Sequence, residues 1–390
     1  MRPAALLLAA ALTATARAQW TLQPAPTTAD LRGIDNVGNG IAWASGTNGT
    51  ILRTTDTGAH WRLCTIPPNA EHLDFRGIQA FDATTAIAMS SGPGDQSRLY
   101  KTTDACQTWT LLFTNPDKTG FFDALRAPFR SNRRHPSLML LGDPVNGRFK
   151  LWNVYPNATN GKSIRPAARL QQAMKGEAIF AASNSSLFVI DTNLYFLFGT
   201  GGSGGSRIIR HEDEAGGFND VSAGTAYIDQ PIGNDTATSG VFSIAVSSVM
   251  GSTLHRWWRP YYRPNEQFLT QLAVAVGGDY AKPDDADSIA AYCTSIDNAW
   301  SGMIWHAATT QPHGYRSAVA YDPTTRTWIT VGPNGTDIST DDGRNWRPLT
   351  PTKDEPADAD KNWNALSLPY VVGPHGRIGI LNPSALQPQP

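Results

Sequence analysis

The sequence has little cysteine and no long apolar run in its body, and each absence excludes a class of protein. Three cysteines among 390 residues are too few for the disulfide framework of a small secreted domain. No Cys/His spacing typical of a zinc site occurs, so we expect no metal ion and no cofactor. After the N-terminus, no segment approaches the ~18 consecutive apolar residues of a membrane-spanning helix, so we expect none in the mature chain.

An excess of basic charge is missing as well. The chain has 32 Lys and Arg against 33 Asp and Glu, a net charge of −1, so it lacks the electrostatic footprint of a nucleic-acid-binding protein. No G-x-G-x-x-G precedes a helix, and Gly161-Lys162-Ser163 lacks the upstream glycine of a P-loop. Glycine, proline and tryptophan are plentiful, at 35, 27 and 12 residues. This composition is typical of a β protein with many turns.

The N-terminus has the parts of a secretory signal peptide. Arg2 precedes an apolar run at positions 4–14, and Ala16-Arg17-Ala18 matches a small-x-small cleavage site. We therefore predict a signal peptide over residues 1–18 and a mature chain that begins at Gln19. The expected location is the periplasm or the extracellular space.

The pattern Ser/Thr-x-Asp-x-Gly-x-x-Trp, known as the Asp-box, occurs three times. The copies are Thr54–Trp61 (TTDTGAHW), Thr102–Trp109 (TTDACQTW) and Ser339–Trp346 (STDDGRNW). We expect each carboxylate to accept hydrogen bonds from N–H groups two or three residues on, and each tryptophan to fill the space between neighbouring sheets. The glycine supplies a left-handed backbone, so Cys106 in its place is expected to weaken the second turn. The structural residues of these turns are Asp56, Trp61, Asp104, Trp109, Asp341 and Trp346.

The Asp-boxes lie within longer repeats. The unit Arg32–Ile34 recurs 44 positions later as Arg76–Ile78 (76 − 32), and Trp61 recurs 48 positions later as Trp109 (109 − 61). A period of roughly 40–50 residues with several short strands predicts a β-propeller, because solenoid repeats are usually about half that length.

A propeller blade has four strands, a to d from the central channel outward, and Asp-boxes fall at the c–d turns. Seven glycine-rich segments are candidates for the b–c turns at the opposite end: Gly46–Gly49, Gly92–Gly94, Gly142–Gly147, Gly199–Gly205, Gly277–Gly278, Gly332–Gly335 and Gly373–Gly376. Strands a are expected to begin near Arg32, Arg76, Phe121, Glu177, Gly240, Tyr315 and Trp363. We therefore predict an all-β, seven-bladed β-propeller, with six or eight blades as alternatives. It is expected to form one domain over residues 19–383, with a C-terminal tail at 384–390, and the segment Trp20–Pro24 is expected to complete the last blade.

Several blocks of the chain resemble one family. They are Gly142–Phe149 (GDPVNGRF), Gly176–Ser185 (GEAIFAASNS), Gly199–Arg207 (GTGGSGGSR), Gly240–Ala245 (GVFSIA), Gly277–Tyr280 (GGDY), Tyr315–Val319 (YRSAV) and Gly332–Trp346. Together they are similar to BNR-repeat propellers of the photosystem II stability/assembly factor-like family, sialidase-superfamily folds that are often labelled oxidoreductase or glycosyl hydrolase. Members in oxygenic phototrophs help to assemble photosystem II by binding its precursor subunits. The resemblance implies an exported, non-catalytic binding or assembly protein with a protein partner.

On a propeller, the charged residues of these blocks fall at the starts of strands a or at b–c turns, around the mouth of the channel. The candidate ligand-binding residues are Arg148, Arg207, Arg316, Glu177, Asp143 and Asp279. Buried charges of both signs must be paired or must bind something. Two alternatives therefore stand: salt bridges that fix the ring, or a site for a polypeptide or a polar or anionic ligand.

The alternative function is a sialidase-like glycoside hydrolase that acts on an acidic sugar. Arg148, Arg207 and Arg316 would clamp a carboxylate, and the catalytic candidates are Glu177, Asp143, Asp279, Tyr280 and Tyr315. Sialidases carry an Arg-Ile-Pro motif in the first blade, whereas Arg32 and Arg76 are followed by Gly-Ile. This departure favours the non-catalytic binding protein and leaves enzyme activity open.

Two further features have open interpretations. Cys64 and Cys106 are expected on adjacent repeats, where they either pair in an oxidising compartment or remain thiols, and Cys293 has no evident partner. An insertion at 250–271 carries interleaved aromatic and arginine residues, which either stack on a ligand or pack over a blade edge. We expect the protein to be a monomer.

Overall fold

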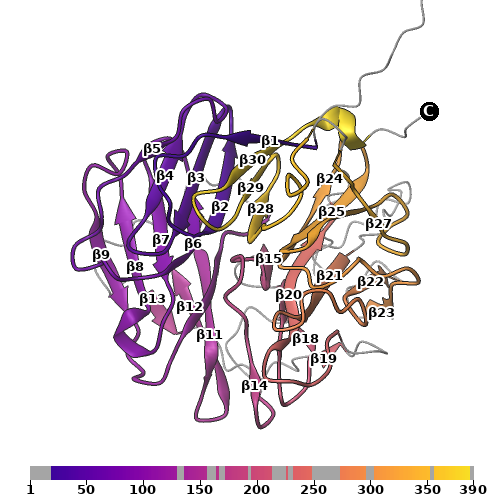
Figure 1. Cartoon of the computed structure of the whole chain (residues 1–390). Coiled ribbons are helices and arrows are strands. Elements are labelled where there is room, and N and C mark those ends of the chain that lie inside the picture. The colour runs from indigo at the N-terminus through magenta and orange to yellow at the C-terminus, as the bar shows by residue number, and fades with distance from the viewer. Residues whose placement is uncertain are drawn as a thin grey trace, which may run out of the picture.

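The computed structural model describes residues 19–129, 136–155, 164–166, 172–191, 195–212, 225–226, 232–247, 273–295, 303–351 and 355–386. The predicted signal peptide and the insertion at 250–271 lie outside the described residues. Within this part of the chain, the strands form seven antiparallel sheets, and in most of them consecutive strands are neighbours. Figure 1 shows the sheets arranged around a common centre. The structure confirms the predicted seven-bladed β-propeller.

The first four blades follow one another along the chain. Blade one comprises β2 (Leu31–Gly38), β3 (Ile41–Gly46), β4 (Ile51–Thr54) and β5 (Arg62–Leu63). Blade two comprises β6 (Phe75–Ala80), β7 (Ala86–Ser90), β8 (Arg98–Thr102) and β9 (Thr110–Thr114), with the 3-10 helix η1 (Gly94–Gln96) in its b–c turn. Blade three comprises β10 (Phe122–Arg126), β11 (Leu138–Val145), β12 (Arg148–Val154) and β13 (Ile164–Pro166). Blade four comprises β15 (Leu187–Asp191), β16 (Tyr195–Gly199), β18 (Ile208–Glu212) and β19 (Thr225–Ala226).

The last three blades complete the ring. Blade five comprises β20 (Ser239–Val246), β21 (Ala273–Asp279), β22 (Ala290–Ser295) and β23 (Met303–Ala307), and its inner edge is extended by β14 (Glu177–Ala178) and β17 (Gly201–Gly202). Blade six comprises β24 (Ala318–Asp322), β25 (Thr327–Gly332), β26 (Gly335–Ser339) and β27 (Arg347–Pro348). Blade seven comprises β28 (Ala365–Ser367), β29 (Tyr370–Val372), β30 (Ile378–Leu381) and the N-terminal strand β1 (Trp20–Gln23). The 3-10 helix η4 (Pro383–Leu386) follows β30.

The ring closes through the N-terminal strand, as the sequence predicts. Strand β1 pairs antiparallel with β30, with Trp20 opposite Leu381. The buried Trp20 indole donates a hydrogen bond to Thr336 Oγ1 of blade six (3.0 Å) and lies 5.9 Å from the Trp363 ring. The innermost strands of blades seven and one, β28 and β2, are also in contact. Residues from the two ends of the chain therefore share one blade.

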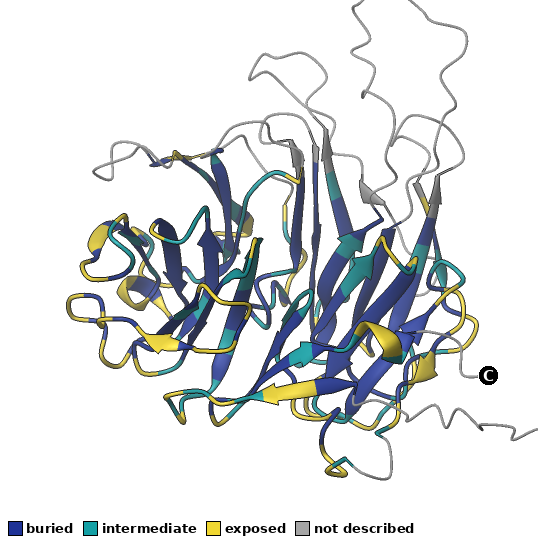
Figure 2. Ribbon diagram, turned by 90° about the horizontal axis from the view of Figure 1, so that it is seen from above, coloured by how far each residue is buried: buried dark blue, intermediate teal, exposed yellow. Residues whose placement is uncertain are grey.

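The core lies between neighbouring blades rather than within one. Trp43 of blade one and Tyr100 of blade two belong to the same buried cluster, and Trp328 of blade six packs in a cluster with Val274 of blade five. Buried residues follow the inner strands, whereas exposed residues gather on the outer strands and turns (Figure 2). Since each blade covers its neighbour, apolar burial holds the blades in a ring.

The three Asp-box segments share one hydrogen-bond pattern. In the first, the Thr54 hydroxyl accepts the N–H of Gly58 (3.1 Å), and the Asp56 carboxylate accepts the N–H of His60 (2.9 Å). The carboxylate therefore reaches four residues on, rather than the two or three that the sequence predicts. At Cys106 φ is +62°, and its N–H still donates to Thr102 (3.1 Å), so this cysteine adopts the left-handed backbone that a glycine would.

The tryptophans of these segments are buried against the preceding blade. Trp61 lies 5.8 Å from the Tyr370 ring of blade seven, at an interplanar angle of 87°. Trp109 packs in a cluster with residues of blade one, and Trp346 packs with residues of blade five. As the pattern predicts, each tryptophan fills the space between two sheets.

A disulfide joins Cys64 and Cys106. Cys64 follows β5 of blade one, and Cys106 lies in the c–d turn of blade two. Of the two alternatives left open by the sequence, the structure shows the paired form. Cys293 is a buried free thiol in blade five.

Blade four departs from the expected pattern. Its inner strand is β15, which begins at Leu187, about ten residues after the Glu177 that was expected to begin it. Strand β14 at Glu177 instead pairs with β17, which pairs with β20 at Gly201 and Gly240. A Cβ atom at Gly201 would lie 2.6 Å from the Phe180 ring, so only glycine allows this close approach. The chain between β14 and β15 is thereby left to run across the centre of the ring.

Candidate functional site

The segment 179–186, here called the plug, crosses the channel between the inner strands. The Asn184 side chain accepts the N–H of Leu125 (2.7 Å) and donates to its carbonyl (2.9 Å), so it satisfies the inner edge of blade three. The Ser183 hydroxyl donates to the carbonyl of Ser317 next to blade six (2.7 Å). One short segment therefore joins two blades on opposite sides of the ring.

Further bonds tie the plug to blades two and five. The Ser185 carbonyl accepts the N–H of Ile244 (2.9 Å), and the hydroxyls of Ser185 and Ser243 are 2.7 Å apart. Arg76 of blade two donates to the carbonyl of Ala181 (3.4 Å). Because the chain itself occupies the middle of the ring, the candidate site is a surface. We call the end of the ring that carries the b–c turns the mouth face.

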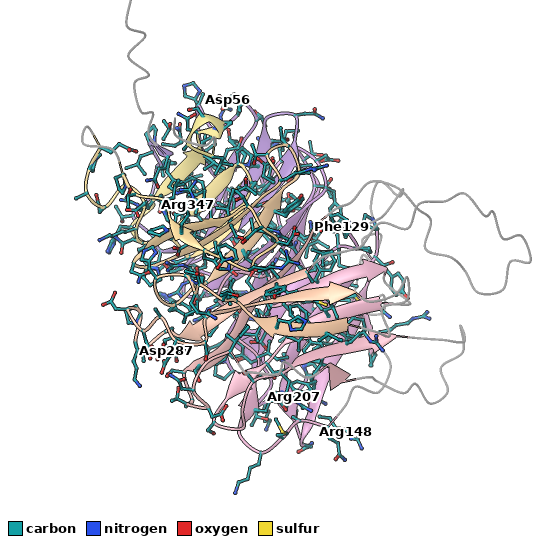
Figure 3. All side chains as sticks on the ribbon, turned by 90° about the vertical axis from the view of Figure 1, so that its right-hand side faces the viewer. Asp56, Phe129, Arg148, Arg207, Asp287 and Arg347 are labelled. Atoms are coloured by element: carbon teal, nitrogen blue, oxygen red, sulfur yellow. A yellow bond between two sulfur atoms is a disulfide. The ribbon has the colours of Figure 1, made fainter. Side chains whose placement is uncertain are left out.

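Glu177 and Arg207 form a two-bonded ion pair beside the plug. Arg207 donates to both carboxylate oxygens, at 2.8 and 2.6 Å, and the Thr200 hydroxyl donates to one of them (2.6 Å). The Glu177 side chain has no exposed surface, and that of Arg207 is 11% exposed. Arg207 also donates to the carbonyl of Gln172 (3.3 Å). Gln172 in turn forms an antiparallel β-bridge with the exposed Arg148. Figure 3 shows Arg148 and Arg207 at the same end of the molecule.

Arg316 is held in a second buried pair, with Asp337 of blade six. Its guanidinium binds that carboxylate (Nε to Oδ2, 2.8 Å) and also the carbonyl of Tyr315. His313 Nδ1 lies 2.8 Å from the other carboxylate oxygen. Burial raises the pKa of Asp337, but His313 and Arg316 outweigh it, so the pKa is lowered overall. The pair is therefore charged, and Arg316 has no exposed surface for a ligand.

Two carboxyl groups of blade three lie near the plug. Asp143 accepts the N–H of Ile179 (2.8 Å), and burial raises its pKa to about 6. Asp123 is 1% exposed, and neither of its carboxylate oxygens has a hydrogen bond of good geometry. Burial raises the pKa of Asp123 well above its usual value, the charge of Asp143 raises it further, and Arg76 partly offsets both. Burial therefore favours the protonated form of the Asp123 carboxyl more than that of an exposed aspartate.

Aromatic rings form a corner on the blade five side of the mouth face. Phe180 of the plug stacks on Phe242 at 4.2 Å and 14°, and Tyr280 stands across both rings at 6.2 and 6.1 Å. Tyr315 is buried edge-on against Phe242 (4.8 Å). Tyr280 is 50% exposed and Phe180 is partly exposed, whereas the rings of Phe242 and Tyr315 are buried. Asp279 anchors the Tyr280 turn by accepting the N–H of Ala281 (3.0 Å).

Arg32, Asp74 and Arg76 form a cluster at the blade one and two side. Arg76 Nε lies 2.8 Å from the Asp74 carboxylate and Arg32 Nε lies 3.7 Å from it. All three side chains are partly exposed, between 23% and 31%. The repeated Arg-Gly-Ile units marked the two arginines in the sequence. Asp74, two residues before Arg76, carried no signal of its own.

The predicted site residues are thus divided among separate groups. Arg207 and Arg316 each bind an acid of their own region, so the three candidate clamp arginines do not converge. Arg207 and Arg316 are each held in an ion pair, that of Arg316 within blade six, whereas Arg148 is exposed and Asp143 half-buried. Sequence reasoning missed Asp123 and Phe180. In the sequence, the only signal for Phe180 was the presence of Gly201 and Gly240, two glycines that leave space for its ring.

Comparisons with known proteins support the fold. No family model and no curated protein matches the chain. Among solved structures, YCF48 from Cyanidioschyzon merolae matches with a TM-score of 0.55 at 14% identity, over 94% of this chain and 100% of that one. A structure of YCF48 bound to a D1 peptide matches with a TM-score of 0.53 at 13% identity, over 94% and 96% of the two chains. This likeness in fold agrees with the resemblance seen in the sequence.

Proposed function

We propose that this protein is a propeller that binds a polypeptide on its mouth face and acts as an assembly factor-like binding protein. The observation that carries the proposal is the plug. Because chain fills the centre of the ring, the accessible groups at the mouth are spread across several blades rather than gathered around one small pocket. Examples are the partly exposed side chains of Arg32, Arg76 and Asp143 and the half-exposed ring of Tyr280. A spread of charged and aromatic groups suits an extended partner with several contacts.

A relative in fold supports the same ligand class. The structure named YCF48 bound to D1 peptide is a propeller with a peptide ligand. Charged side chains in the present chain would give specificity and orientation to such a complex. The described residues contain no helix long and apolar enough to cross a membrane.

The sialidase-like alternative has less support from the geometry. Hydrolysis of an acidic sugar needs guanidinium groups that converge on the substrate carboxylate. Arg316 is fully buried against Asp337, and Arg207 is bonded to both carboxylate oxygens of Glu177 through Nε and Nη2. A sugar carboxylate would have to displace two internal carboxylates to bind these arginines.

Export belongs to the same proposal. The Cys64–Cys106 disulfide supports it, because structural disulfides persist mainly in oxidising compartments. Residues 1–18 have the sequence of a signal peptide. Edman sequencing of protein secreted or exported by its host should begin at Gln19, and a protein retained in the cytoplasm with residues 1–18 intact would contradict this part.

Site-specific photo-crosslinking tests the binding face. A photoreactive phenylalanine is placed at Arg148 or Lys282 on the mouth face, and, as controls, at Leu63 or Leu111 on outer strands; all four positions are exposed. In the cells that make the protein, we expect polypeptide adducts from the two mouth positions and none from the outer ones. Adducts only from the outer strands, or hydrolysis of fluorogenic acidic-sugar glycosides by the purified protein, would overturn the proposal.

A further inference from the structure

We propose that the aromatic corner at Tyr280 is the site that takes a cationic side chain, lysine or arginine, of the polypeptide ligand. This inference rests on the proposed function and assigns the chemistry of one part of the ligand. The corner offers the half-exposed Tyr280 ring beside Phe180, which is itself partly exposed. Tyr280 stands at 79° to Phe180 and at 84° to Phe242, so the rings present faces in two directions. Faces of aromatic rings attract cations, and an arginine or lysine within about 6 Å of a ring is stabilised.

The b–c turn that follows Tyr280 adds negative charge to the same place. Asp284 and Asp287 are exposed, Asp285 is partly exposed, and Lys282 is the one cation of the turn. Within the described residues, no lysine or arginine forms an ion pair with these three carboxylates. Figure 3 shows Asp287 on the outside of the ribbon. A ligand cation would meet uncompensated carboxylates here.

The turn is positioned against the aromatic corner by the backbone. Tyr315 donates its N–H to the carbonyl of Pro283 (3.0 Å), and the Asn334 side chain donates to the same carbonyl (3.1 Å). Asp279 fixes the start of the turn by accepting from the Thr236 hydroxyl (3.1 Å). These bonds fix the backbone of the acidic turn next to Tyr315 of the aromatic corner, and lysine or arginine is recognised by both aromatic faces and carboxylates.

The distribution of charge on the mouth face disfavours an acidic ligand side chain at Tyr280. The partly exposed arginines Arg32 and Arg76 belong to blades one and two, and both are close to Asp74. An acidic side chain at Tyr280 would face the three carboxylates of the 280–289 turn, where Lys282 is the one cation. The blade five side therefore favours a basic segment of the partner, and the two charged regions give the ligand one orientation.

Fluorescence anisotropy with three labelled decapeptides tests the inference on the mature full chain. The probes are deca-lysine, deca-arginine and deca-glutamate. We expect the two cationic peptides to bind more tightly than deca-glutamate. Tyr280→Ala should weaken deca-arginine binding about 5-fold, in line with a cation–π contact. The triple change Asp284→Asn, Asp285→Asn, Asp287→Asn should weaken it about 10-fold or more and reduce its dependence on salt.

Matched variants separate the site from general charge attraction. Tyr155→Ala removes a tyrosine that is 39% exposed outside this corner, and Asp95→Asn with Asp358→Asn removes two exposed acids of other blades. These controls should bind deca-arginine as the wild type does. Equal losses in controls and site variants, or tighter binding of deca-glutamate, would overturn the inference. If mouth-face crosslinks to a polypeptide persist in that case, the proposed function stands without it; if they are also absent, both fail.

Discussion

The clearest single-residue result is that Arg316 is a buried structural cation. It was a candidate ligand residue on sequence grounds, because Tyr-Arg-Ser-Ala-Val lies at the start of an inner strand. In the structure it has no exposed surface, and it binds Asp337 and the carbonyl of Tyr315. Removing one partner from such a pair leaves an uncompensated charge in the interior.

We therefore expect Arg316→Ala to lower the free energy of unfolding by about 3–5 kcal/mol, measured by urea denaturation. The double variant Arg316→Met with Asp337→Asn should recover at least half of that loss, because neither charge is then left unpaired. An Arg316→Ala protein that unfolds like the wild type but no longer crosslinks to its partner would instead make Arg316 a ligand residue.

Residue-level chemistry also explains why the Asp-box turns were predictable. Their bonds join residues four apart, as between Asp56 and His60, so all the determinants lie in one octapeptide. The identity of the partner N–H was misjudged by one or two positions. Cys106 shows a further limit, because a pattern that treats glycine as the left-handed residue does not anticipate a cysteine with φ of +62°.

At the scale of elements, the blades were predictable and the plug was not. Glycine-rich turns mark the b–c ends locally, and the b–c connection lies at six of the seven predicted positions. The remaining prediction was wrong, because Gly277–Gly278 lie within β21 and the turn begins at Tyr280. The plug has no periodic apolar pattern, and its bonds connect residues 59 and 134 positions apart. Such contacts follow only from the assembled ring, so the Glu177 segment was assigned to an inner strand that in fact begins at Leu187.

The plug should contribute to stability mainly through Asn184. Asn184→Ala would leave both the N–H and the carbonyl of Leu125 without a partner in the interior, and an orphaned buried group costs about 1–3 kcal/mol. Alanine is also strained at the φ of +60° that asparagine tolerates there. We expect a loss of about 2–4 kcal/mol in urea denaturation, together with faster hydrogen exchange at Leu125.

Asn364→Ala is the matched control for this change. Asn364 lies just before β28, and its side chain donates one hydrogen bond, to the carbonyl of Leu31 (2.9 Å). Asn364→Ala should lower the free energy of unfolding by less than Asn184→Ala does, and it should not alter hydrogen exchange at Leu125. If the two variants are equally stable, the hydrogen bonds of the plug do not stabilise the ring of blades.

At the scale of the whole molecule, the shifted carboxyl groups set how stability depends on pH. Burial raises the pKa of Asp35 and of Asp143 to about 6, from a usual value of 3.8. Hydrogen bonds, chiefly from the N–H of His60, lower the pKa of Asp56 to about 2. Hydrogen bonds, chiefly from the Thr108 hydroxyl, lower the pKa of Asp104 to about 2. The two groups act in opposite directions because stability rises with pH only where the unfolded state binds more protons.

These opposite pKa shifts predict that stability has a maximum at a pH between the two sets of pKa values. Asp35 and Asp143 bind protons more tightly when folded, so stability should increase as the pH falls from about 6 toward 4. Asp56 and Asp104 bind protons less tightly when folded, so their contribution is present above the unfolded pKa and is lost as the pH falls from about 4 to 2. We expect the Tm to be highest between about pH 4 and pH 5 in calorimetric scans.

Paired variants assign each side of this profile to its residues. Asp35→Asn with Asp143→Asn should flatten the fall in Tm above the maximum, because these two carboxyls then no longer have to ionise where burial opposes it. Asp56→Asn with Asp104→Asn should flatten the fall below it, because the Asp-box turns then lose nothing on acidification. Asp95→Asn, which removes an exposed acid outside both sets, should leave both sides unchanged. A Tm that climbs steadily from pH 4 to pH 7 would contradict the prediction, since the buried carboxyls of blades one and three would then not resist ionisation.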